Sequence, residues 1–210
     1  MSQPIYRDYI LNAKFVAALI LLSVLLFALG FLVMGFGLIF IGIPPTPEEF
    51  LRIIFFILVS IVYVAFWLNL SILFSVKFRQ AATSALSGIS IWLFFSIFFN
   101  MIINLIAKGI APRNALGQEQ VIHFQKTILH LMRLNPGQLF SDATTTLLVP
   151  SVRSLGPLTM EQMRGAIPSP LPLGQSLLMV WPQVTALIAG TIVFFALAYT
   201  LFMRREIRSR

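Results

Sequence analysis

The sequence predicts an all-α integral membrane protein with four transmembrane helices and a large outer segment that contains short helices. Of its 210 residues, 58% are hydrophobic and only 10% are charged, whereas soluble proteins carry about 25% charged residues. Four apolar segments are each long enough to cross a bilayer, which takes roughly 20 helical residues. The basic residues, 15 Lys and Arg against 7 Asp and Glu, lie mostly beside these segments.

The first predicted span, Phe15–Ile43, contains no charged residue. At about 1.5 Å per residue it is longer than a bilayer is thick, so we expect it to tilt, bend at its glycines or project. Pro44, Pro45 and Pro47 then end it. Its apolar region is much longer than the roughly 7–15 residues of a cleavable signal peptide, so we expect it to remain as an anchor.

The second predicted span, Phe50–Val76, has a clear start signal. Thr46 can cap a helix, Pro47 suits its first position, and the two glutamates that follow lie near the positive end of the helix dipole. Arg52 lies near this start, where a long side chain can reach the headgroups. The third and fourth predicted spans are Ser84–Ala107 and Leu177–Met203.

Basic residues in the short flanks set the predicted orientation. Arg7 and Lys14 precede the first span, Lys77 and Arg79 separate the second from the third, and four arginines follow the fourth. By the positive-inside rule both termini are cytoplasmic, in a bacterial-type inner membrane. The predicted parts are a cytoplasmic segment 1–14, three spans in 15–107, an extracytoplasmic segment 108–176, the fourth span 177–203 and a basic tail 204–210.

The extracytoplasmic segment carries its own helical signals. Apolar residues in Glu119–Leu134 recur at helical spacing, and Asn135-Pro136-Gly137 follows as a stop signal. Ser141 and Asp142 could cap a second short helix that runs to Val149. We expect these helices to lie on the membrane surface or to cover the helix bundle.

The sequence shows no convergent catalytic chemistry, and we expect no catalytic residue, metal or bound cofactor. It has no cysteine, no G-x-S-x-G or H-E-x-x-H motif, and no P-loop, so any ATP is bound by a partner subunit. His123 and His130 could align on one helix face. They are either interfacial histidines or a metal pair at an uncommon spacing.

Three asparagines lie at membrane depth. Asn69 belongs to the second span, and Asn100 and Asn104 lie four residues apart on one face of the third. They form either interhelical hydrogen bonds or a polar path for a substrate. Acidic residues are absent from this depth, which argues against an ion-coupled carrier or a proton pump.

Four stretches together resemble the permease subunits of ABC-2 type transporters. The P-x-x-R-x-x-x-x-x-x-K-F pattern of residues 4–15 is similar to a family segment that enters the membrane. The turn at residues 74–85, with Leu73 before it, resembles a family turn that begins LFS-x-x-F-R. Residues 134–144 are similar to a stretch before the last span, and residues 202–208 resemble the usual ending.

This resemblance implies a permease subunit of an exporter that is energised by a separate ATPase subunit, often beside a second permease subunit. It places the ATPase contact at residues whose other role is to set topology and touch headgroups: Tyr6, Arg7, Asp8, Lys14, Lys77 and Arg79. Such permeases usually have six spans. We therefore expect a fragment or a natural short form that lacks the first two. The competing hypothesis is a non-transporting scaffold or assembly factor that binds a partner through its outer segment; neither predicts a nucleic-acid partner.

Overall fold

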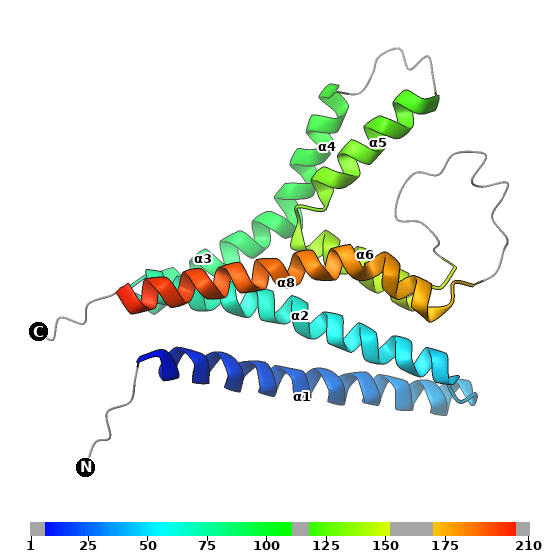
Figure 1. Cartoon of the computed structure of the whole chain (residues 1–210), viewed down its shortest axis with the longest axis horizontal. Helices are drawn as coiled ribbons and strands as arrows, with labels where there is room; N and C mark the ends of the chain where they lie inside the picture. Colours follow the sequence, from blue (N-terminus) through cyan, green and yellow to red (C-terminus); the bar gives the residue numbers. More distant parts are fainter. Residues whose placement is uncertain (1–6, 111–117, 152–169, 205–210) are drawn as a thin grey trace, which may run out of the picture. The chain divides into compact units, whose positions relative to one another are not determined.

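The computed structural model describes residues 7–110, 118–151 and 170–204, and these ranges contain helices and short turns without any strand (Figure 1). The predicted all-α membrane class is therefore confirmed. Four helices in these ranges are long and apolar enough to cross a membrane: Tyr9–Ile41, Pro47–Lys77, Ala81–Gly109 and Leu173–Arg204. The chain divides into two compact units, a first unit of Met1–Ser90 with Thr185–Arg210 and a second unit of Ile91–Val184.

The first unit contains an antiparallel hairpin of two long helices, α1 (Arg7–Ile41) and α2 (Pro47–Lys77) (Figure 1). The helix α1 begins before the predicted Phe15, because it continues into the polar residues that precede the apolar run. It ends at Gly42, whose φ of +75° is readily adopted by glycine and rarely by other residues.

The start of α2 is a capping box, as its sequence predicts. The Thr46 hydroxyl accepts a hydrogen bond from the Glu49 amide at 3.3 Å, and the Glu49 carboxylate accepts one from the Thr46 amide at 2.8 Å. One turn later, the buried Arg52 pairs with Glu48 at 2.8 Å. The Arg52 side chain therefore extends toward the N-terminal end of α2, where Glu48 is exposed.

The C-terminal part of α8 (Leu173–Arg204), from Thr185 onward, completes the first unit. Phe195 lies 5.3 Å from Phe15 of α1, and Phe194 lies 5.1 Å from Phe66 of α2, measured between ring centroids. A β-carbon at Gly190 would lie 2.9 Å from the Phe66 ring. The absent side chain therefore lets α8 approach α2 closely.

The third predicted span is an unbroken succession of three helical segments. They are α3 (Ala81–Leu93), the π-helical turn η1 (Phe94–Phe98) and α4 (Phe99–Ile110). Nothing in the composition of Ser84–Ala107 predicted the π-helical turn. This helix exceeds the predicted span at both ends, and α1 exceeds its own at the start, because hydropathy marks the apolar length and not the hydrogen-bonded length.

The second unit also contains α5 (Gln118–Met132) and α6 (Pro136–Leu148). The helix α5 confirms the predicted helix Glu119–Leu134. The predicted cap of the second short helix by Ser141 and Asp142 is wrong, because α6 already begins at Pro136, and Asn135 caps it by accepting from the Gly137 amide at 2.8 Å. The Asn-Pro-Gly sequence ends one helix and starts the next, since proline is favoured at a first helical position.

Candidate functional site

Except for Arg52 near the start of α2, the described basic residues of the first unit lie at one end, where α1 begins, α2 ends, α3 begins and α8 ends (Figure 1). Lys14, Lys77 and Arg79 are exposed there, and so is Arg204. The α1–α2 turn forms the opposite end. Of the other predicted ATPase contacts, Tyr6 lies outside the described residues, and Arg7 and Asp8 form the first turn of α1.

The predicted membrane-depth asparagines fall into different units. Asn69 is fully buried in the first unit, and its Nδ2 donates to the Thr191 carbonyl of α8 at 3.3 Å. Its Oδ1 has no hydrogen-bond partner among the described residues. Asn69 therefore makes an interhelical contact and keeps one shielded acceptor.

Asn100 and Asn104 belong to α4 in the second unit. Asn100 is half-buried, and its shielded Oδ1 finds no hydrogen-bond partner in the described part of the chain, whereas Asn104 is exposed. Their i, i+4 spacing thus spans two environments. Asn104 is the more exposed of the two.

Asn135, predicted to be part of a helix stop signal, connects two elements of the second unit. Its Nδ2 donates to the Phe95 carbonyl of η1 at 2.7 Å, while its Oδ1 caps α6. The residue is 4% exposed. A π-helical turn shifts the backbone bonding from i+4 to i+5, so a carbonyl there can accept from outside the helix.

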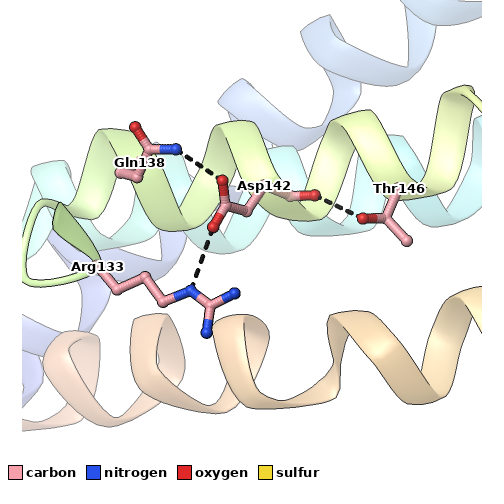
Figure 2. A network of polar contacts seen from close by, with 4 residues as sticks. All are labelled: Arg133, Gln138, Asp142 and Thr146. Carbon is pink, nitrogen blue, oxygen red and sulfur yellow. Dashed lines mark hydrogen bonds and ion pairs between the residues drawn. The ribbon is translucent and has the colours of Figure 1, made fainter. Parts of the chain in front are cut away.

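A polar network braces the same α5–α6 turn (Figure 2). The Asp142 carboxylate, 9% exposed, accepts from Arg133 Nε at 3.3 Å and from Gln138 Nε2 at 2.6 Å. The Thr146 hydroxyl donates to the Asp142 backbone carbonyl at 2.9 Å. Arg133 directly follows α5 and Asp142 lies inside α6. The ion pair therefore links the end of α5 to α6 across the turn.

His123 and His130 are both exposed on α5. In the described ranges no group of three His, Cys, Asp or Glu side chains could hold a metal ion. Among the residues that the structure describes, the two histidines therefore have no third side chain of the kind that a zinc site needs.

A family model described as ABC-2 family transporter protein matches residues 1–207. The chain belongs to the ABC-2 transporter family. The resemblance found in the sequence is thereby confirmed, and the long apolar helices are those of a multi-pass cell-membrane protein with a permease role. The family provides membrane subunits of transporters and is not itself catalytic, so the scaffold hypothesis is not favoured. No curated protein and no solved structure matches this chain.

Proposed function

We propose that this chain is the permease subunit of an ABC-2 exporter, energised by a separate ATPase subunit and working beside a second permease subunit. The observation that carries the proposal is the family match over residues 1–207. ABC-2 membership implies an ABC ATPase partner in general, and the sequence has no P-loop of its own.

We place the ATPase on the basic end of the first unit, with Tyr6, Arg7, Asp8 and Lys14 on one side and Lys77 and Arg79 on the other. Their charges support this, because Lys14, Lys77 and Arg79 are exposed and come from different elements. The positive-inside rule assigns this end to the cytoplasm, where an ATPase would bind.

For the substrate, we assign Asn104 and Asn100 to a polar path, and we assign Asn69 to helix packing. The exposure of Asn104 and the shielded, unpartnered oxygen of Asn100 support the first assignment. The hydrogen bond from Asn69 to Thr191 supports the second.

The docking assignment is tested with the paired reversal Lys77→Glu and Arg79→Glu in the full chain, purified from its own cells in mild detergent. We expect the ATPase no longer to co-purify. The two substitutions reverse the charge that complements the ATPase surface, so that like charges face each other. Lys126→Glu is the control, since Lys126 is equally exposed but lies in the predicted outer segment.

Membrane insertion is followed in the same cells by carbonate extraction. An ATPase that stays with the paired reversal contradicts the docking surface. An ATPase lost equally from Lys126→Glu also contradicts it, and absence of any ATPase from the wild-type preparation contradicts the proposed function itself.

A further inference from the structure

The chain passes between its two units inside two helices. One passage, Ser90 to Ile91, lies within a helical turn of η1. The other, Val184 to Thr185, lies within a turn of Pro182 in α8. Both helix irregularities therefore lie where one compact unit gives way to the other.

Each irregularity weakens the helix that contains it. A proline inside a helix removes a backbone donor and crowds the preceding turn. A π-helical turn inserts an additional residue and is found frequently at functional sites. Sharp helix bends occur at these two features more than elsewhere.

A side-chain amide lies beside each of the two helix irregularities. Asn135 Nδ2 donates to the Phe95 carbonyl within η1. Once its side-chain amide is turned by 180°, Gln183, which is 3% exposed, donates from its amide nitrogen to the Met179 carbonyl at 2.9 Å and to the Val180 carbonyl at 3.1 Å. At η1, a backbone carbonyl of the irregular turn is thus bonded by a side chain, which satisfies a polar group within an apolar span.

The Asn135 and Gln183 contacts differ in the sequence separation between donor and acceptor. The contacts open to the turned Gln183 amide lie within its own helix, whereas the Asn135–Phe95 bond joins residues 40 apart in sequence. Asn135 is itself held by its capping bond to Gly137 and lies in the turn that Arg133 and Asp142 brace. The donor is therefore anchored independently of η1.

We propose that η1 and Pro182 are paired hinges on which the second unit moves, and that Asn135 is the latch that holds the η1 hinge. As a movement used during transport, the hinge rests on the proposed function. The latch itself does not, because it is a contact inside the second unit. Asn135 is a positioning residue, which acts by fixing the geometry of the third span.

The chain allows the latch to be separated from the helix cap. Asn135→Asp keeps the oxygen that accepts from Gly137 but replaces the amide donor with a carboxylate. Asn135→Ser also keeps a capping oxygen, on a side chain that carries no amide. Asn12→Asp is the matched control, because Asn12 is exposed in α1 of the first unit.

Hydrogen exchange is measured on the full chain in nanodiscs, at a pH where an aspartate is ionised. In both Asn135 variants we expect the amides of η1 and the first turn of α4 to exchange about fivefold faster, the factor that one net hydrogen bond provides. The amides of α6 should be unchanged, which shows that the unit is still folded.

Movement is measured with spin labels at Ser75→Cys and Gln125→Cys, one exposed position in each unit of a chain without cysteine. We expect a wider distance distribution in Asn135→Asp than in wild type or Asn12→Asp. Unchanged exchange in η1 overturns the latch, and an unchanged distribution overturns the hinge. Neither measurement needs an ATPase or a substrate, so either can fail while the transport assignment stands.

Discussion

Different kinds of interaction stabilise the inside of each of the two units. In the first unit, long helices pack through aromatic rings such as those of Phe66 and Phe194. They also approach closely at Gly190, which has no side chain. In the second unit, short helices are joined by side-chain hydrogen bonds, among them the Asn135–Phe95 bond and the Arg133–Asp142 pair.

This difference shows which kind of change each unit tolerates. Close helix packing in a membrane depends on van der Waals contact, so the first unit should be sensitive to side-chain volume. A polar network loses most when one partner is removed and the other stays buried, so the second unit should be sensitive to the loss of a single group.

The largest expected effect is in the second unit. Asp142→Ala removes the acceptor of both Arg133 and Gln138, so we expect a loss of about 2–3 kcal/mol in the free energy of unfolding. Steric trapping in bicelles measures it, with the exposed neighbour Ser141→Ala as control. Equal stability of the two variants would mean that the network does not hold the α5–α6 turn.

The next effect is in the first unit. Gly190→Leu places a side chain against the Phe66 ring, so we expect a loss of about 1–3 kcal/mol from overpacking. Gly35→Leu is the matched control, because a β-carbon there meets nothing within 4 Å. The same unfolding measurement applies, and the comparison fails if Gly35→Leu destabilises the protein as much.

The smallest expected effect is at Asn69, the polar exception in the first unit. Asn69→Leu removes the bond to Thr191, and such bonds contribute only about 0.6 kcal/mol on average. It also removes an oxygen that has no partner among the described residues. We expect a change below about 1 kcal/mol in unfolding free energy; a larger loss would show that Asn69 has a further partner.

The sequence predicted the parts of the fold that depend on local composition. The four apolar helices follow from hydropathy, the start of α2 from its Thr-Pro-Glu-Glu signal, and α5 from its helical spacing. Each of these is decided by residues within a few turns of one another. The same holds for the end of α1, although Gly42 stops it slightly before the predicted Ile43.

The contacts that join elements could not be predicted in the same way. The Asn135–Phe95 bond connects residues far apart in sequence, and the acceptor is a backbone carbonyl, which every residue has. The π-helical turn has an ordinary apolar composition, so its sequence carries no signal. Asp142 was interpreted as a cap because its type suits one, and its actual partner, Arg133, lies beyond the preceding turn.

The α1–α2 turn bears on the biogenesis of the protein. Several of its polar groups are bonded locally: the Gly42 amide donates to the Leu38 carbonyl, the Phe50 amide donates to the Thr46 carbonyl, and Thr46 and Glu49 form the capping box. A hairpin closed by such near neighbours has low contact order and needs nothing synthesised later. The two helices can therefore enter the bilayer as a pair once Lys77, the last residue of α2, has left the ribosome. The helix α8, which is made later, can then pack against a hairpin that has already formed.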